Sequence, residues 1–259
     1  KKIMGIINIS HDSFYDGGRY NSIDKVNTQI SNLVSNGADI IDIGAASSKP
    51  GSKLIDPRKE LDIISDYIIE LSNNFKDIHL SIDTYNSHVA EFALSKGFSI
   101  INDISAGRYD SNIFNIVKDY NAGYVLMHMQ GDPETMQENP KYDNVVESIQ
   151  LFLKTKIQKL QDSGFDNTII DPGFGFGKSI DDNFKILRDL ESFQSLKRPI
   201  IVGLSRKSMI YKTLNITPEE SLNGTSALNI LALERGANIL RVHDAKEAFE
   251  CINLLKKLN

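Results

Sequence analysis

The chain has 259 residues, of which 41% are hydrophobic and 24% are charged, and it carries one cysteine. Its length suits a single domain, because α/β barrels commonly reach ~250 residues without dividing. The formal net charge of -5 argues against a nucleic-acid binder, since proteins that bind the phosphate backbone carry clustered lysine and arginine. No apolar run is long enough to cross a bilayer, so we expect no membrane partner and a cytoplasmic protein.

Eight short apolar runs recur along the chain, and each ends in a polar or small residue. The runs end at Asn8, Gly44, Asp83, Asn102, His128, Asp171, Ser205 and His243. Parallel strands that are buried on both faces read as continuous apolar runs of this kind. In a closed ring of eight such strands, all the carboxyl ends meet at one face. The pattern predicts the α/β class and a (β/α)8 TIM barrel with a binding site at that face.

Helical patterns lie between the apolar runs, at residues 23–36, 57–75, 87–96, 113–121, 145–163, 181–196, 226–235 and 246–258. Five of them lead into the next strand through a glycine, at positions 37, 97, 123, 164 and 236. Glycine adopts the positive φ that the residue after a helix often needs. We therefore expect repeated helix–strand units in one domain, 1–259. An open doubly wound sheet is the rival, because spacing does not reveal strand order.

Two polar segments, 11–22 and 131–142, are long for barrel loops, and loops of that kind at the carboxyl face often act as lids. The sequence also begins almost inside its first predicted strand, which leaves open a leading segment or a fused domain. Cys251 lies in an amphipathic stretch, where we expect a small buried hydrophobe.

The segment DPGFGFGKS, from Asp171 to Ser179, is the densest motif. It fails as a Walker A loop, because Pro172 stands where that motif needs glycine, and Lys178 likewise replaces the third glycine of a dinucleotide fingerprint. What remains is an aspartate at a strand end, followed by backbone that can pass close to a ligand. Phe174 and Phe176 would form apolar walls. A tight turn without a ligand is the alternative for the glycines.

The segments GLSRKS and RVHD, at 203–208 and 241–244, place cations and hydroxyl groups after the seventh and eighth strands. TIM barrels frequently hold phosphate groups there, so we expect an anion. A lysine or arginine at a loop end is more often solvated surface. Arg241 is different, because a bare surface charge is unexpected inside the run ILRVH.

The side chains at three strand ends, Asp83, Asn102 and Asp171, have alternative roles. They could bind a divalent metal, accept N–H groups of a heterocycle or cap the following helices. Met127 and His128 are expected to face the same way, for packing or for ligation. The sequence has no CxxC pair, no His-x-x-x-His pair and no dense carboxylate cluster, so we expect no tightly ligated zinc or iron.

Seven segments, in order along nearly the whole chain, resemble the signatures of the dihydropteroate synthase family. They are MGIINISHDSFYDGG, GADIIDIGAASSKPG, IDTY, IIND, DPGFGFGK, SRKS and RVHD. The resemblance implies a homodimeric TIM-barrel transferase of folate biosynthesis that sulfonamides target. It implies that 6-hydroxymethyl-7,8-dihydropterin pyrophosphate condenses with p-aminobenzoate, giving 7,8-dihydropteroate and pyrophosphate, with Mg²⁺ as the cofactor.

The resemblance also implies three sets of contacts at positions of this chain. The pterin would contact Asp83, Asn102, Met127, Asp171, Phe176 and Lys207. The pyrophosphate would contact Asn8, Ser48, Arg241 and His243, with Asn8 as the protein ligand of the metal. p-Aminobenzoate would contact Phe14, Ser47, Ser48, Lys49, Pro50, Phe176, Lys207 and Ser208. The implied catalytic residues are Asp83, Lys207 and Arg241.

These residue types fit a dissociative reaction. A carboxylate such as Asp171 can accept two N–H groups of a pterin, and Asn102 offers both a donor and an acceptor. As the pyrophosphate bond breaks, positive charge spreads into the ring, where Asp83 can stabilise it while Arg241 meets the leaving group. We therefore expect an SN1-like substitution without a covalent enzyme intermediate.

The chain departs from the family pattern in two places. Ala46 and Lys49 stand where members usually carry glutamate and arginine, and Ser10 and His11 replace a usual Thr-Pro pair. Lysine is a point charge rather than a bidentate fork, so we expect Lys49→Arg to lower the KM for p-aminobenzoate. Two alternatives stay open. A pterin-dependent methyltransferase would not need the pyrophosphate-binding segments SRKS and RVHD. A non-catalytic binding module would not need to keep the polar residues, which are Asp83, Asn102, Asp171, Lys207 and Arg241.

Overall fold

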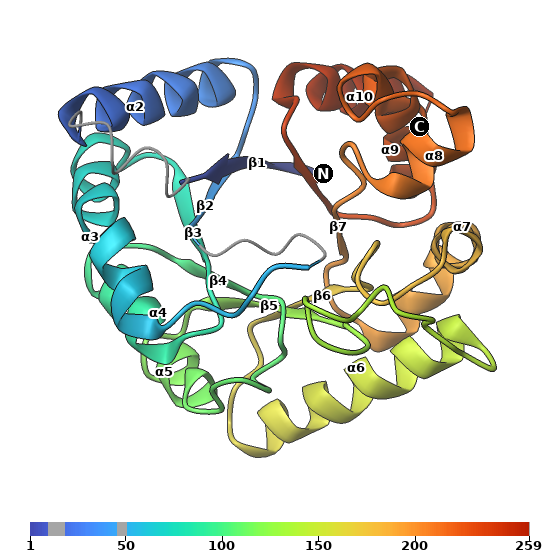
Figure 1. Ribbon diagram of the computed structural model, residues 1–259, viewed down its shortest axis with the longest axis horizontal. Helices are drawn as coiled ribbons and strands as arrows, with labels where there is room; N and C mark the ends of the chain where they lie inside the picture. Colours follow the sequence, from blue (N-terminus) through green and yellow to red (C-terminus); the bar gives the residue numbers. More distant parts are fainter. Residues whose placement is uncertain (10–18, 46–50, 259) are drawn as a thin grey trace.

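The computed structural model describes residues 1–9, 19–45 and 51–258. Within these residues strands alternate with helices, and the helices form an outer ring around the strands (Figure 1). The strands are β1 (Lys2–Asn8), β2 (Ile40–Gly44), β3 (His79–Asp83), β4 (Ile100–Asp103), β5 (Gly123–Met127), β6 (Thr168–Asp171), β7 (Ile201–Val202) and β8 (Ile239–Val242).

The helices that cover the strands follow the predicted pattern closely. They are α2 (Arg19–Ser35), α3 (Pro57–Asn74), α4 (Ser87–Ser95), α5 (Ile113–Asp119), α6 (Val145–Asp162), α7 (Ile180–Arg188), α8 (Ser208–Leu214), α9 (Leu222–Glu234) and α10 (Ala245–Leu258). Two 3₁₀ helices, η1 (Leu190–Leu196) and η2 (Glu219–Ser221), lie between them.

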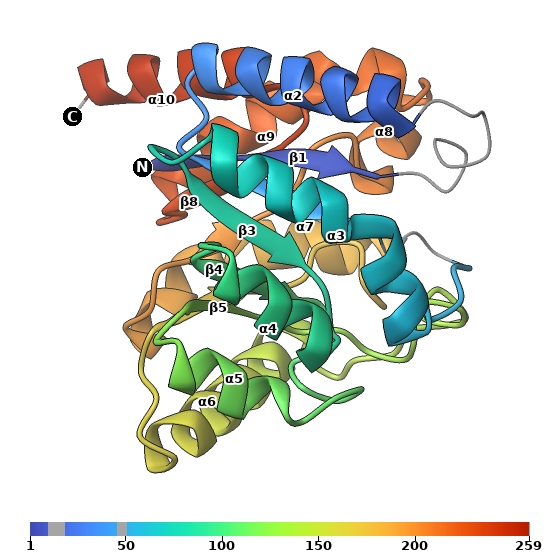
Figure 2. The same cartoon turned by 90° about the vertical axis from the view of Figure 1, so that its left-hand side faces the viewer.

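The strand order is β6-β5-β4-β3-β2-β1-β8-β7, and the neighbouring pairs are parallel. An isolated parallel bridge between Ile170 and Ile200 joins the two ends of this order, where the Ile170 N–H donates to the Pro199 carbonyl at 2.9 Å. The ring is therefore closed, and its cyclic order excludes the doubly wound sheet, in which the order reverses in the middle. In Figure 2 the arrows of β1 and β3 point to the same side. The predicted TIM barrel is confirmed.

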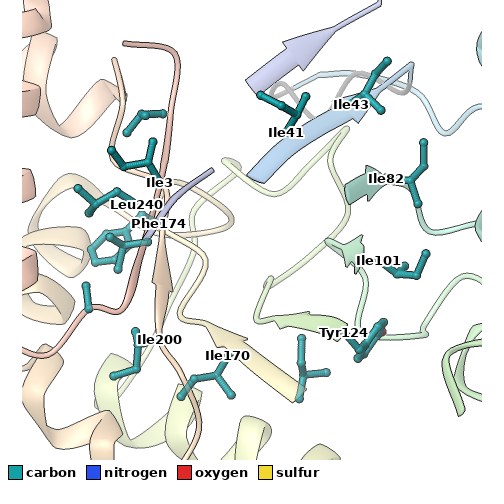
Figure 3. Close-up of a cluster of buried hydrophobic side chains, with 14 of the residues drawn as sticks. Ile3, Ile41, Ile43, Ile82, Ile101, Tyr124, Ile170, Phe174, Ile200 and Leu240 are labelled. Carbon is teal, nitrogen blue, oxygen red and sulfur yellow. The ribbon is translucent and has the colours of Figure 1, made fainter. Parts of the chain in front are cut away.

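Two apolar layers surround the strands. The larger layer lies between strands and helices, where Ile82, Ile101 and Tyr124 point away from the barrel axis (Figure 3). A smaller cluster fills the amino end of the interior, with Met4, Ile40, Ile100, Val125, Ile201 and Ile239. Because strand side chains alternate between faces, the residue two positions later also points inward, nearer the carboxyl face. Asp42, Asn102 and Arg241 hold such positions.

The differences from the predicted elements have local causes. The predicted helix 181–196 is divided into α7 and η1, with Asp189 at the junction. The short helix α8 was not predicted, because its 7 residues begin at the last residue of SRKS and show too little periodicity. Four of the five glycines have positive φ, but Gly123 begins β5, and Asn121 takes the left-handed conformation with φ 48°.

Capping residues fix the helices that follow the site loops. The Asp56 carboxylate accepts the N–H groups of Arg58 and Lys59, and Pro57 occupies the first turn of α3. At α7, Ser179 and Asp182 form a capping box. This box sets the point at which the glycine-rich segment after β6 ends.

Candidate active site

A charged network occupies the barrel interior above the apolar layer. Arg241 on β8 donates from Nε to Asp42 Oδ2 and from Nη2 to Asp83 Oδ2, each at 2.7 Å. Its side chain is 20% exposed, whereas those of Asp42 and Asp83 are 0% and 11% exposed. Arg241 is therefore an interior cation, as its place in an apolar run predicted.

Asp42 connects this network, and sequence reasoning missed it. Besides Arg241, its carboxylate accepts the Ser81 hydroxyl at 2.6 Å and the Asn102 Nδ2 at 2.9 Å. Charge-assisted hydrogen bonds of this kind fix the orientation of both partners. A signal was present, because Asp42 interrupts the run IIDIG as Arg241 interrupts ILRVH.

Asp83 ends β3 beside Asn102 of β4, with which it is in register. Burial raises the pKa of Asp83 to about 7, while Arg241 opposes the rise and Asp42 and Glu60 add to it. The last residue of β2, Gly44, leaves the space for this side chain, since a Cβ there would lie 2.9 Å from Asp83 Cβ. The carboxyl group thus changes charge closer to neutral pH than an exposed aspartate does.

A second buried carboxylate, Glu60 on α3, supports the segment after β3. It accepts a short hydrogen bond from Asn86 Nδ2, and Asn86 N–H donates to Thr84 Oγ1 at 3.1 Å. Its Oε1 has no partner among the described residues, and burial raises the pKa of Glu60 to about 7. Sequence reasoning missed Glu60 because a glutamate in the first turn of an amphipathic helix usually faces solvent.

Asp171, Lys207 and Phe176 gather on the opposite side of the interior. The buried Asp171 accepts the Gly173 N–H at 2.7 Å, and burial raises its pKa while that hydrogen bond and Lys207 oppose the rise. Lys207 donates to the Phe174 carbonyl at 2.7 Å, and its Nζ lies 4.4 Å from the centre of the Phe176 ring. Burial lowers the pKa of Lys207 to about 8. Two charged groups and an aromatic ring therefore face one space.

The capping alternative holds for only part of the polar set. Asp103, directly after Asn102, accepts the N–H groups of Ser105 and Gly107 at 2.7 and 2.8 Å, so it fixes the turn there. The α4 helix begins after Asn86, which makes no side-chain cap. Asp83 and Asn102 are thus engaged in the interior network instead, while Asp171 both caps a turn and faces the site.

The expectation that Met127 and His128 face the same way is wrong. Met127 points inward and packs in a cluster with Tyr85, Ile104, Met129, Met136 and Phe176. The His128 ring packs edge-on against Phe152 of α6, with ring centres 5.0 Å apart. Adjacent residues of a strand alternate between faces, so only Met127 can contact a ligand in the barrel. Burial lowers the pKa of His128 to about 3, as expected for a packed, neutral ring.

The loops after β7 and β8 are fixed to each other. The Ser205 hydroxyl lies 3.0 Å from His243 Nδ1, and Arg206 pairs with Asp244 through two hydrogen bonds of 3.1 and 2.7 Å. Ser208 begins α8 immediately afterwards. Arg206 therefore serves to join the two loops, whereas Lys207 and Arg241 face the site. Burial and Arg241 lower the pKa of His243 to about 4.

Asn8 closes β1 at the carboxyl face, with an exposed side chain. Within the described ranges, no group of three or more His, Cys, Asp or Glu residues could hold a metal ion. A metal at this face would therefore need oxygen ligands from a substrate as well as from Asn8.

Several predicted residues lie outside the described residues, namely Phe14, Ser47, Ser48, Lys49 and Pro50, together with Ser10, His11 and Ala46. The chain that follows them lies at the edge of the site. The Gly51 N–H donates to the Pro133 carbonyl at 2.9 Å, and the Ile55 N–H donates to the Tyr85 hydroxyl at 2.7 Å.

The long segment 131–142 contacts the loops on both sides of it. The Arg108 guanidinium and the Tyr109 hydroxyl reach Asp132 at 2.6 and 2.7 Å, and the Tyr142 hydroxyl donates to the Gly177 carbonyl at 2.8 Å. Met136, in the middle of the segment, is buried. The segment expected as a lid is part of the wall of the site in this structure.

Comparisons with known proteins agree with this geometry. The family described as pterin binding enzyme matches residues 4–243. The chain is 36% identical over 256 residues to the dihydropteroate synthase of Escherichia coli strain K12, which covers 98% of this chain and 90% of that protein.

Two solved structures share the fold over nearly the whole chain. The Yersinia pestis dihydropteroate synthase with a sulfonamide drug complex has a TM-score of 0.92 and 34% identity, covering 99% of this chain and 94% of that one. The Xanthomonas albilineans dihydropteroate synthase in complex with 7,8-dihydropteroate has a TM-score of 0.87 and 33% identity, covering 99% and 93%.

Proposed function

The chain belongs to the dihydropteroate synthase family, and we propose from this that it condenses 6-hydroxymethyl-7,8-dihydropterin pyrophosphate with p-aminobenzoate. It is a transferase of the pterin-methyl group in folate biosynthesis. The observation that carries this function is the convergence of Asp171 on β6, Lys207 in the loop after β7 and Arg241 on β8 at the carboxyl face of one barrel. Sulfonamides are expected to compete with p-aminobenzoate, as the drug complex of the Yersinia pestis relative suggests.

The polar and apolar side chains of the interior suit the edge and the faces of a pterin ring. Asp171 would accept N–H groups of the ring, and Asn102, oriented by Asp42, would complete the polar edge. Lys207 would donate to the ring carbonyl. Met127 and Phe176, which belong to one apolar cluster, would contact the faces of the ring.

The substitution is proposed to be SN1-like. As the bond to pyrophosphate breaks, positive charge develops on the methylene carbon and spreads into the dihydropterin ring. Asp83 would stabilise this charge, and its ion pair with Arg241 favours the ionised carboxylate that the role requires. The amine of p-aminobenzoate then forms the new C–N bond, loses a proton and leaves no covalent link to the protein.

The leaving group would meet the cationic side of the site. Two N–H groups of Arg241 bind Asp42 and Asp83, and the guanidinium has further donors that can bind an anion. His243, held by Ser205, would add a neutral donor, since its pKa is lowered. Ser48 would contact the same anion, and this part of the proposal rests on the family resemblance.

Magnesium is proposed as the cofactor. Mg²⁺ is usually bound by one or two protein oxygens together with substrate phosphates and water, and the exposed Asn8 offers one such oxygen. The bound ion would neutralise charge on the departing diphosphate. For p-aminobenzoate, the proposed contacts are Phe176, Lys207 and Ser208, with Phe14, Ser47, Ser48, Lys49 and Pro50 from the two signature segments.

A coupled pyrophosphate assay tests the function. We expect pyrophosphate release only when the pterin pyrophosphate, p-aminobenzoate and Mg²⁺ are all present, and omission of any one should abolish it. Methyl transfer to a corrinoid without pyrophosphate release would favour the methyltransferase alternative, and neither reaction would favour a binding module. Mass spectrometry of the quenched enzyme should show no pterin–protein adduct, since such an adduct would contradict the SN1-like route.

A homodimer is also proposed. Exposed leucines lie on three neighbouring helices, with Leu214 on α8, Leu231 on α9 and Leu254 on α10. Light scattering should give twice the chain mass, and the double variant Leu231→Glu, Leu254→Glu should give a monomer. The matched control is Leu151→Glu on α6, which changes a leucine about as exposed as Leu254 and should leave the dimer intact.

None of the described helices is both long enough and apolar enough to cross a membrane. The cytoplasmic location stays a prediction, which fractionation of the source cells would check.

A further inference from the structure

Lys178 ends the glycine-rich segment after β6, and only 2% of it is exposed. Its ammonium donates to three backbone carbonyls, at 3.1 Å to His128, 2.8 Å to Gly173 and 2.9 Å to Phe176. A lysine ammonium has three N–H donors, so these bonds use all of them. Lys178 therefore has no donor left for a substrate and acts within the protein.

The three carbonyls belong to two different loops. His128 follows β5, whereas Gly173 and Phe176 belong to the segment after β6. The loops approach so closely that a Cβ at Gly173 would lie 2.0 Å from the His128 carbonyl oxygen, and one at Gly177 would lie 2.2 Å from that of Gln130. The two loops therefore lie backbone to backbone, and the Lys178 ammonium joins them by binding carbonyls of both.

The other side of the same segment faces the site. The Phe174 carbonyl accepts from Lys207 at 2.7 Å, and the Phe176 ring lies 4.4 Å from the same ammonium. A Cβ at Gly175 would lie 3.1 Å from Lys207 Cδ, so the backbone there also limits where the Lys207 chain can run. A shift of the segment would therefore move Phe176 and Lys207 together.

We propose that Lys178 is a positioning residue, whose buried ammonium holds the glycine segment in the shape that presents Phe176 and Lys207 to p-aminobenzoate. It touches no substrate and acts through backbone carbonyls. Phe176 and Lys207 are proposed contacts of the pterin as well, but Asp83, Asn102 and Asp171 would bind it from strands, so its binding depends on Lys178 less. The inference rests on the proposed function and adds a residue to its machinery.

The variant Lys178→Met tests the proposal, because methionine fills similar space without the ammonium. We expect kcat/KM for p-aminobenzoate to fall about 100-fold, the size of loss that a displacement of about 1 Å can produce. The kcat/KM for the pterin pyrophosphate should fall by a smaller factor, because its contacts on the strands stay in place. Lys185→Met on α7, which removes an exposed lysine nearby, is the matched control and should leave both constants unchanged.

A second variant separates positioning from folding. Lys178→Ala removes the side chain beyond Cβ, and n-propylammonium has the shape of the missing part. Added n-propylammonium should restore activity with p-aminobenzoate, whereas sodium chloride at equal ionic strength should not. Circular dichroism and thermal melting establish that each variant is folded before kinetics are measured.

Two outcomes would overturn the proposal. In one, Lys178→Met keeps the wild-type kcat/KM for p-aminobenzoate. In the other, both substrates lose kcat/KM by the same factor and propylammonium restores nothing, as a merely structural lysine would behave. Failure of the proposed function would appear in the wild-type chain, which would then release no pyrophosphate. Failure of the Lys178 proposal would appear in the Lys178 variants, with an active wild-type chain.

Discussion

Asp42 and Arg241 lie 199 positions apart in the sequence, yet Arg241 Nε donates to Asp42 Oδ2 across 2.7 Å inside the barrel. The pair joins β2 to β8 on either side of β1. Because Asp42 is 0% exposed, its charge depends on its partners, which among residues 1–9, 19–45 and 51–258 are Arg241, Asn102 and Ser81. Asp42 thus orients Asn102 and Arg241, two proposed substrate contacts, although Asp42 itself contacts neither substrate in the proposed reaction.

Replacing Asp42 by asparagine should therefore destabilise the fold. The change leaves a buried guanidinium with one carboxylate fewer, and breaking a buried ion pair costs about 3–5 kcal/mol. Urea unfolding followed by circular dichroism measures the loss. The control is Asp39→Asn, which removes a surface ion pair with Lys2 and should cost at most about 1 kcal/mol. Equal losses in the two variants would contradict the assigned role of Asp42.

Arg241→Ala should abolish turnover. Removal of one preorganised charge contact from a developing anion typically lowers kcat by about 10²–10³-fold, and here the ion pair that keeps Asp83 ionised is lost as well. Arg241→Lys keeps the charge but cannot span two carboxylates, so it should fold and remain strongly impaired. Arg188→Ala, at an exposed position of α7, is the control for pyrophosphate release. An unimpaired Arg241→Ala enzyme would refute the leaving-group role.

Gly44→Ala should destabilise the protein through Asp83. The new Cβ would lie 2.9 Å from Asp83 Cβ, and overpacking of this kind costs about 1–3 kcal/mol. Gly203, directly after β7, offers a matched control, because a Cβ there would meet no heavy atom within 4 Å. Gly203→Ala should change the free energy of unfolding by no more than about 0.5 kcal/mol. Similar melting temperatures for the two variants would contradict the prediction.

Stability should depend on pH through Glu60. Burial raises its pKa from 4.5 to about 7, so the folded state holds the proton more tightly than the unfolded state does. This contribution to stability is present at low pH and is lost as the pH rises from 4.5 to 7. In Glu60→Gln that part of the decline should be missing, a difference of about 2–3 kcal/mol between the two ends of the window.

Urea unfolding at several pH values between these limits measures the difference. The control is Glu91→Gln, which changes an exposed glutamate of α4 and should preserve the wild-type slope. A Glu60→Gln protein whose stability falls with pH as steeply as the wild type would show that Glu60 is ionised in the fold throughout.

The residues that could be predicted from sequence are those at strand ends. Asp171 and Asn102 follow apolar runs, and Arg241 interrupts one. In a closed parallel barrel, these positions lie at the carboxyl ends of the strands. Their shared location followed from the parallel topology alone.

The residues that were missed depend on facts that a linear pattern does not carry. Glu60 is buried only because α3 packs against the segment after β3, and its sequence context matches that of a solvated first turn. The same reason applies to Lys178, whose three acceptors come from two loops. Met127 and His128 could have been assigned correctly, because alternation along a strand already separates adjacent side chains.

The junction of β6 and β7 differs from the rest of the barrel, since β7 has 2 residues and the bridge to β6 is made by Ile200, the residue before it. A pterin bound by Asp171 on β6 and by Lys207 in the loop after β7 would contact both sides of this junction. The substrate would then link β6 to the loop after β7, beside the junction where the two ends of the strand order are held by one bridge.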